Sequence, residues 1–224
     1  MTQKYRLTSN TVITPAGVIL YQIEALRDLP FAGVKKGDLG GYIEKEENLS
    51  QYENAWVFDS AQVFGTARVF ASARVFGSAQ VYENARVYEN AQVSGRAQVS
   101  GSARVYENAW VFGRAQVSGS AQVFGTARVF DSARVFGSAQ VFGTARVSEN
   151  ARVSITPINL IGLRYGITIT DEHIKIGCEQ HTKAEWEEFT DAEIKVMEEP
   201  TSLPFWEQYR SLILALAKSH GPIN

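Results

Sequence analysis

The sequence has few of the residues that would indicate a secreted, membrane-spanning or nucleic-acid-binding protein. Its 224 residues include one cysteine, Cys178, so no disulfide can form within the chain, and a reducing compartment is expected. It has no run of about 18 apolar residues and no apolar segment after Lys4, which argues against a membrane span and a secretory signal. The net charge of −2 provides no basic field for nucleic acid or anionic lipid. These absences predict a soluble, cytoplasmic protein.

What the sequence does contain is a six-residue repeat that runs without insertion or deletion from Ala55 to Thr156. All 17 hexads have Ala at position 1 and Val at position 3, with Gln, Arg or Trp between them. A fixed short period predicts a solenoid. Residues 49–54, LSQYEN, are expected to form one more, degenerate hexad in the same phase.

The composition of the hexad predicts how the chain folds. Alternate residues of a strand point to opposite faces, so Ala and Val at positions 1 and 3 point inward and position 2 points outward. Positions 4–6 turn the chain, with Gly at position 5 or Asn at position 6 accepting the positive φ of a corner. A triangle of three hexads is the smallest closed shape, and its narrow interior suits small residues. We therefore predict coils of 18 residues and a rod roughly 27 Å long.

Hexads such as VYENAR and VSENAR resemble the hexapeptide repeat of left-handed parallel β-helix proteins. The resemblance covers residues 55–156 and implies the left-handed winding. The array also resembles the short VYxNAR arrays of phage and prophage proteins, and residues 21–50 and 167–191 are similar to flanking segments in that group. This second resemblance implies a phage-derived protein that acts in the cytoplasm of the host cell.

The regions on either side of the repeat are expected to cover its ends, because exposed strand edges aggregate. Residues 1–54 form a predicted N-terminal β cap with strands at Val18–Ile23 and Gly41–Ile43. Its glycines at positions 37, 40 and 41 match no phosphate-binding motif and are expected in turns.

Residues 157–224 form a predicted α+β module. A hairpin is expected over residues 165–177. Capping boxes beginning at Thr182 and Thr190 predict two short helices. A third helix is expected over residues 204–219, with one apolar stripe. That stripe contains Phe205, Tyr209, Leu212, Ile213 and Leu216.

Position 4 gives the repeat its most uneven surface. Residues 18 apart share one edge of the predicted prism, and one edge is aromatic throughout, whereas the other two are interrupted by serines. Two interpretations remain open: the rings stack on one another, or they form a protein interface in a homotrimer or homodimer. This aromatic edge contains Phe70, Tyr88, Tyr106, Phe124 and Phe142.

Position 2 forms columns of its own on the predicted faces. The repeat has ten arginines and six acidic residues, a net charge of +4, but the acids are interleaved, so nucleic acid is not an expected partner. A solvated surface is the simplest interpretation of these columns. They contain Gln62, Gln80, Gln98 and Gln116 on one face and Arg68, Arg86 and Arg104 on another.

The repeat offers little for catalysis. Many proteins with the left-handed β-helix repeat are acyltransferases with a catalytic histidine, usually near a loop that interrupts the coil. Here His173, His181 and His220 all lie in the C-terminal region, so the coil has no base to activate a hydroxyl or an amine. An acyl-CoA-dependent acyltransferase therefore remains an alternative rather than the leading hypothesis.

One cluster in the C-terminal module has the composition of a metal site. His173, Cys178 and His181 supply three potential ligands, and Asp171 or Glu179 could complete the four that structural zinc requires. The competing interpretation is that these are ordinary hairpin residues, with Cys178 as a small buried side chain.

Together these features predict a non-enzymatic scaffold or protein-binding protein without a cofactor. Its expected partners are further copies of itself and a host or phage protein, and inhibition of a host defence system is one role that the phage resemblance implies. No membrane contact is expected. Besides acyl transfer, the alternatives include sequestration of a small ligand in a cleft between subunits.

Overall fold

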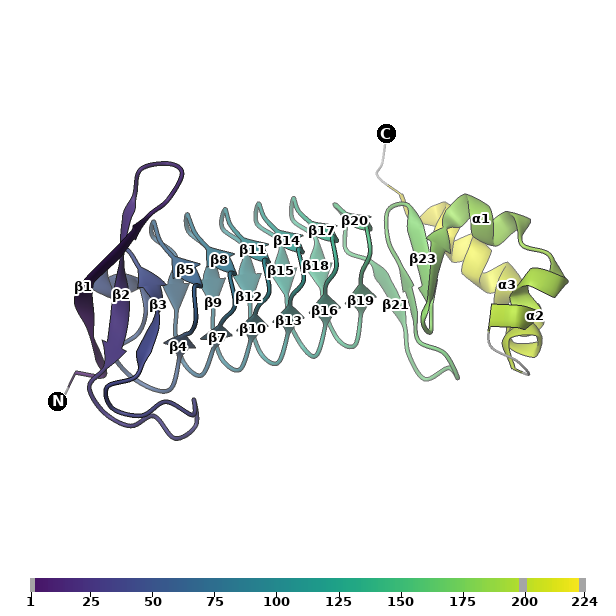
Figure 1. Ribbon diagram of the computed structural model, residues 1–224. Coiled ribbons are helices and arrows are strands. Elements are labelled where there is room, and N and C mark those ends of the chain that lie inside the picture. The colour runs from purple at the N-terminus through teal and green to yellow at the C-terminus, as the bar shows by residue number, and fades with distance from the viewer. Residues whose placement is uncertain (1–2, 198–200, 222–224) are drawn as a thin grey trace.

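The computed structural model describes residues 3–197 and 201–221, and in it the hexads form a parallel β-solenoid (Figure 1). A small β cap lies at the N-terminal end, and an antiparallel sheet with helices lies at the other end. The predicted mainly-β solenoid with a β cap and an α+β module is thus confirmed, while the left-handed winding stays a prediction from the resemblance.

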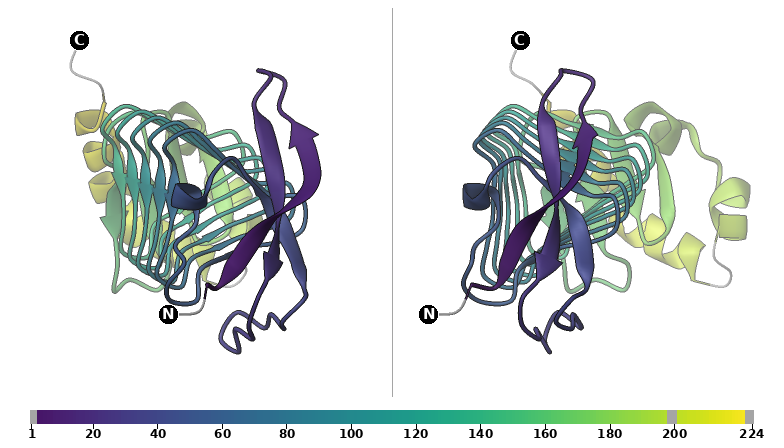
Figure 2. Two further views of the ribbon diagram at one scale, coloured as in Figure 1. Left: turned by 90° about the vertical axis from the view of Figure 1, so that its left-hand side faces the viewer. Right: turned by 60° about the vertical axis from the view of Figure 1, so that its left-hand side comes forward.

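The solenoid has three faces, each a parallel sheet of two-residue strands at positions 2 and 3, as the view along the rod shows (Figure 2). Face one contains β5 (Gln62–Val63), β8 (Gln80–Val81), β11 (Gln98–Val99), β14 (Gln116–Val117), β17 (Arg134–Val135) and β20 (Arg152–Val153). Face two contains β4 (Trp56–Val57), β7 (Arg74–Val75), β10 (Gln92–Val93), β13 (Trp110–Val111), β16 (Arg128–Val129) and β19 (Arg146–Val147). Face three contains β6 (Arg68–Val69), β9 (Arg86–Val87), β12 (Arg104–Val105), β15 (Gln122–Val123) and β18 (Gln140–Val141).

The core of the rod consists of the alanines and valines of the repeat. Every alanine at position 1 and every valine at position 3, from Ala55 to Val153, is at most 1% exposed. The predicted inward orientation is therefore confirmed. A column of side chains this small leaves no room for a larger residue or an unpaired charge.

Backbone hydrogen bonds join the coils, and they all have the same direction at the corners and strand starts. The N–H groups at positions 2, 4 and 6 donate to carbonyls at positions 1, 3 and 5 of the following coil, for example Arg86 to Ala103 at 2.9 Å and Tyr88 to Val105 at 3.1 Å. At these positions each coil therefore presents acceptors toward the N-terminal end of the rod and donors toward the C-terminal end.

The corners use a positive φ at position 5 in 16 of the 17 hexads, whether that residue is Gly, Ala, Asp or Glu. The expectation that Asn at position 6 supplies this conformation was wrong, because the residue before it does. A non-glycine residue is strained in this conformation. Four of the six acids at this position accept a hydrogen bond from a backbone N–H of the next coil. Glu89 Oε2 accepts from the N–H of Glu107 at 2.8 Å, and Asp59 Oδ2 accepts from that of Gly77 at 2.9 Å.

The N-terminal cap contains β1 (Tyr5–Ile13), β2 (Ile19–Ala25), β3 (Leu39–Ile43) and a 3₁₀ helix, η1 (Glu46–Asn48). The two predicted strand regions overlap β2 and β3, but β1 was not predicted. Strand β3 pairs in parallel with β5, so it replaces a missing coil on face one.

The LSQYEN segment is out of phase with the repeat, contrary to prediction. Leu49 pairs with Val69, a position 3 residue, whereas the expected phase would pair it with Ala67. The pair Ile43–Val63 has the same offset of 20 rather than 18 residues. Glu53 has a φ of 60° and is back in phase, so the chain accommodates two extra residues between Leu49 and Glu53.

Side chains of the cap donate to the carbonyls that the first coil leaves unpaired. Asn48 Nδ2 donates to Ala67 O at 2.9 Å, and Lys4 Nζ donates to Ala55 O at 2.8 Å. Tyr5 Oη donates to Leu49 O at 2.7 Å. Lys4 and Tyr5 are fully buried, and burial lowers the pKa of Lys4 to about 7 and raises that of Tyr5.

The C-terminal sheet is antiparallel and contains β21 (Ile158–Leu160), β22 (Ile167–Ile169), β23 (His173–Ile176) and β24 (Glu179–Thr182). The predicted hairpin corresponds to β22 and β23, whereas β21 and β24 were not predicted. One face of this sheet presents Ile167, Ile169 and Ile174 to the helices.

Three helices cover that face: α1 (Lys183–Glu188), α2 (Asp191–Met197) and α3 (Ser202–Ser219). Thr182 caps α1 in a reciprocal box with Glu185, as predicted. The predicted stripe of α3 is wrong at Leu212, which is 51% exposed, and Trp206 is buried instead. None of these described helices has the length and hydropathy needed to cross a lipid bilayer.

The other end of the rod is capped by acceptors. Asp171 Oδ2 accepts from Ser154 N at 2.8 Å, Thr156 Oγ1 from Gln140 N at 3.1 Å and Thr168 Oγ1 from Arg146 N at 3.4 Å. A buried network also joins the sheet to the last coil. Ser148 Oγ bonds Gln180 Oε1 and Lys175 Nζ, each at 3.0 Å.

Val105→Asp should prevent folding, because a carboxylate with no partner would lie in the apolar interior, a cost of several kcal/mol. Circular dichroism and gel filtration should show an unfolded or aggregated chain. Arg104→Asp, on the exposed side of the same strand, should leave the cooperative unfolding transition in place. A soluble Val105→Asp protein that unfolds cooperatively would contradict the structure.

The corners predict opposite effects for two exchanges of glycine and alanine. Ala71 has a φ of 59°, so Ala71→Gly should relieve about 1 kcal/mol of strain, less a smaller entropic cost, and raise the melting temperature slightly. At Gly101 a Cβ atom would lie 2.7 Å from Gly119 O, so Gly101→Ala should lower the melting temperature. Equal shifts for the two variants in thermal unfolding would refute this account.

The lowered pKa of Lys4 predicts that the free energy of unfolding depends on pH. Its folded pKa of about 7 lies below the ordinary 10.5, so between these values the unfolded chain binds more protons and stability rises with pH. The slope should reach about 1.4 kcal/mol per pH unit before Tyr5 reverses it above pH 10. Urea unfolding between pH 7 and 10 should show this slope in the wild type and in Lys36→Met, and a smaller one in Lys4→Met.

Candidate protein interface

The five rings of the aromatic edge form one continuous stack beside face three. Neighbouring ring centroids lie 4.9–5.3 Å apart, with interplanar angles of 1–14°. The first of the two predicted roles, self-stacking, is therefore present in the structure. Each ring fixes its neighbours, so the edge is a rigid aromatic strip rather than five independent side chains.

The other two edges carry only short stacks. Phe64 pairs with Tyr82 at 5.2 Å, and Phe112 pairs with Phe130 at 5.0 Å. On the edge that contains Phe112, Ser94 takes the place of a ring, and Trp110 fills the gap. The indole lies 4.4 Å from the Phe112 ring and donates to Ser94 Oγ at 3.0 Å. Only the aromatic edge is continuous over five coils.

The stack leaves part of each ring at the surface. Phe142, the last ring, is 41% exposed, and the other four are half-buried. Partial burial raises the pKa of Tyr88 and Tyr106, so both phenols stay protonated at neutral pH. Tyr106 Oη donates to Gln122 Oε1 at 3.2 Å, and this contact orients its ring toward face three.

A groove lies at the N-terminal end of the aromatic edge, where the cap inserts its two extra residues. It has a volume of about 480 Å³ and is lined by Tyr52, Phe70, Arg68 and Arg86 among others. The Tyr52 side chain is 64% exposed. The sequence analysis missed this feature, although Ile43 and Leu49 are six residues apart and thus indicate a shifted phase.

The structure does not bring the three predicted metal ligands together. His173 pairs with Thr182 and His181 with Ile174, so the two histidines point to opposite faces of the hairpin. Cys178 is exposed in the turn. Among the described residues, no three His, Cys, Asp or Glu side chains are arranged to hold a metal ion.

His181 packs instead as an aromatic ring between the sheet and α1. Its ring lies 5.4 Å from that of Trp186 and 4.8 Å from that of Phe189, edge to face in both cases. His173 is on β23, and His220 lies at the C-terminal end of α3. All three histidines therefore lie in the C-terminal module, outside the repeat that contains the aromatic edge.

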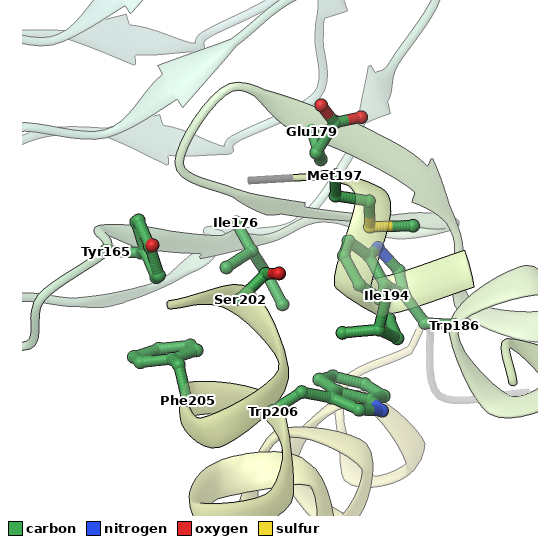
Figure 3. A pocket seen from close by; sticks show the side chains of 9 residues that line it. All are labelled: Tyr165, Ile176, Glu179, Trp186, Ile194, Met197, Ser202, Phe205 and Trp206. Atoms are coloured by element: carbon green, nitrogen blue, oxygen red, sulfur yellow. The ribbon is translucent and has the colours of Figure 1, made fainter. Parts of the chain in front are cut away.

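A small hollow lies between the C-terminal sheet and the helices (Figure 3). Its wall is mainly apolar and includes Tyr165, Ile176, Trp186, Phe205 and Trp206. The volume is about 30 Å³, roughly that of one water molecule. A space of this size is too small to enclose a substrate.

Comparison with known families agrees with the solenoid. A family model described as the YdcK beta solenoid repeat matches residues 79–95 and 97–113, two stretches within the repeat. No curated protein matches the chain. The chain is thus a repeat β-solenoid protein that resembles that family over these two stretches.

Proposed function

We propose that this protein is a non-enzymatic scaffold that binds another protein along the aromatic edge. The observation that carries the proposal is the continuity of the stack: five rings in contact over five coils, on one edge of the three. Exposed aromatic strips of this kind are typical of protein interfaces.

Rigidity makes the strip well suited to binding. A partner that covers a flexible side chain must immobilise it, at about 0.5–1.5 kcal/mol for each side chain. In the aromatic edge the neighbouring rings, such as Tyr88 and Tyr106, are already parallel within 1°. A partner would therefore gain the contact area of these rings at little entropic cost.

The distribution of reactive groups supports a role without catalysis. The hexads contain no histidine or cysteine, and the coil runs through Thr156 without a loop that could form a catalytic cleft. The histidines of the C-terminal module lie on different faces and at different ends of its elements. Acyl transfer remains the rival hypothesis, because proteins with this type of repeat include acyltransferases.

The resemblance to phage arrays supports a phage origin and a host or phage protein as the partner. A rigid rod that exposes one adhesive strip could occupy the binding surface of a host protein and block it. Inhibition of a host defence system is one such role. The five rings indicate that the partner surface is apolar, but they do not identify the partner.

Phe124→Ser should weaken partner binding, because it removes the fourth ring and separates Tyr106 from Phe142. Light scattering should show a lower mass for the variant if the partner is a second copy. If the partner is a different protein, affinity capture from the host should recover it with the wild type and lose it with the variant.

Phe136→Ser is the matched control, since it makes the same change at position 4 of another edge. Circular dichroism should show both variants folded. If Phe124→Ser changes neither mass nor capture, the rings serve only self-stacking and the proposal fails. Turnover of acetyl-CoA by the wild-type chain would instead favour the acyltransferase hypothesis.

A further inference from the structure

Charged residues border the aromatic edge with opposite sign on its two sides. The basic side lies on face three, which precedes the rings in the direction of the chain. It contains Arg68, Arg86 and Arg104, and each arginine pairs in register with the next one, a single coil away. Glu89 and Glu107 follow the rings at position 5 of the corner. The strip therefore has a basic side and an acidic side.

No ion pair among the residues that the structure describes neutralises these arginines. Arg86 and Arg104 are exposed and have no acidic partner among the described residues. Equal charges on adjacent strands destabilise a sheet, so the arginine column costs the folded rod some stability. Glu89 is held by its hydrogen bond to the N–H of Glu107, which keeps the carboxylate at the corner.

The two kinds of charge also occur on the same coils. The hexads at 85–90 and 103–108 are both ARVYEN, so each has Arg at position 2 and Glu at position 5. The next two on this edge, 121–126 and 139–144, are both AQVFGT, and both charges are absent. The edge is thus polar at its centre and apolar toward the C-terminal end.

We infer that the occupant of the aromatic edge is a second copy of this chain whose rod axis is parallel to the first. This inference rests on the proposed protein-binding role of the edge. A twofold axis along the rods places the basic side of one edge opposite the acidic side of the other, at the same height. Arg86 then faces the partner's Glu89, and Arg104 faces the partner's Glu107.

The antiparallel arrangement has the opposite consequence. A twofold axis perpendicular to the rods brings the two arginine columns face to face and the two glutamates face to face, which repels. The parallel twofold axis gives an isologous interface with the rings at its centre and two oppositely charged borders.

The test uses single cysteines at the two ends of the edge, in a Cys178→Ser background. Ser72→Cys lies beside the first ring and Thr144→Cys beside the last, about 19 Å apart at ~4.8 Å per coil. A short bismaleimide should link two copies of Ser72→Cys, and equally two copies of Thr144→Cys. A mixture of the two variants should give no link between unlike sites.

Linking only between unlike sites, or a monomeric wild type in light scattering, would overturn the parallel arrangement. Arg86→Glu combined with Arg104→Glu should weaken self-association about tenfold, and added salt should strengthen the association of this variant while it weakens that of the wild type. The proposed protein-binding role would be refuted only by a different result, namely that neither self-association nor the capture of another protein depends on Phe124. A monomer that captures a host protein through Phe124 would therefore refute the parallel pair and keep the scaffold.

Discussion

The fold depends on one interaction, the hydrogen bond from the backbone of each coil to the next. Because these bonds share a direction at the corners and strand starts, the rod ends differ: one exposes carbonyls and the other exposes N–H groups. The caps match this difference. Lys4, Tyr5 and Asn48 donate at the first coil, and Asp171, Thr156 and Thr168 accept at the last. The caps are thus chemically complementary to their own ends of the rod.

The same hydrogen bonds align equivalent residues of successive coils, so small differences between hexads produce columns of like residues on the surface. Residues that are 18 positions apart in the sequence lie about one strand spacing apart in space. Phe or Tyr at position 4 of five successive coils therefore forms a stack. The choice of Arg and Glu in the ARVYEN hexads becomes a charged border in the same way. The surface that we propose as the partner site is therefore encoded by outward residues that contribute little to the core.

Most of the rod could be predicted from the sequence, because its geometry is local and repeated. Ala at position 1 and Val at position 3 identify the interior in every coil, and the structure buries them all. The corner prediction was right for Gly at position 5 and off by one residue where Asn occupies position 6, since both residue types are permissive and composition alone does not separate them. Where Glu89 takes the positive φ, a hydrogen bond to the next coil compensates, and that contact is not local in sequence.

The caps were predicted less well, because nothing in them repeats. Strands β1, β21 and β24 are defined by their pairing with neighbours rather than by their own pattern. The two-residue phase shift before Glu53 follows from the pairing of β3 with β5. The metal hypothesis depended on spacing along the chain, but the strand register separates His173 from His181 across the hairpin. The column of five rings was predicted correctly, because it follows from the period alone, whereas its role as an interface stays a prediction.

Because every coil has 18 residues, the number of coils can also change without a change in the two caps. Every interior coil presents the same backbone groups to both neighbours, so one coil can be duplicated or lost without altering what either cap must recognise. Such a change would lengthen or shorten the aromatic column by one ring and leave its chemistry intact. Gene duplication within the array would therefore change the length of the aromatic edge in steps of one coil, while the two ends stay as they are.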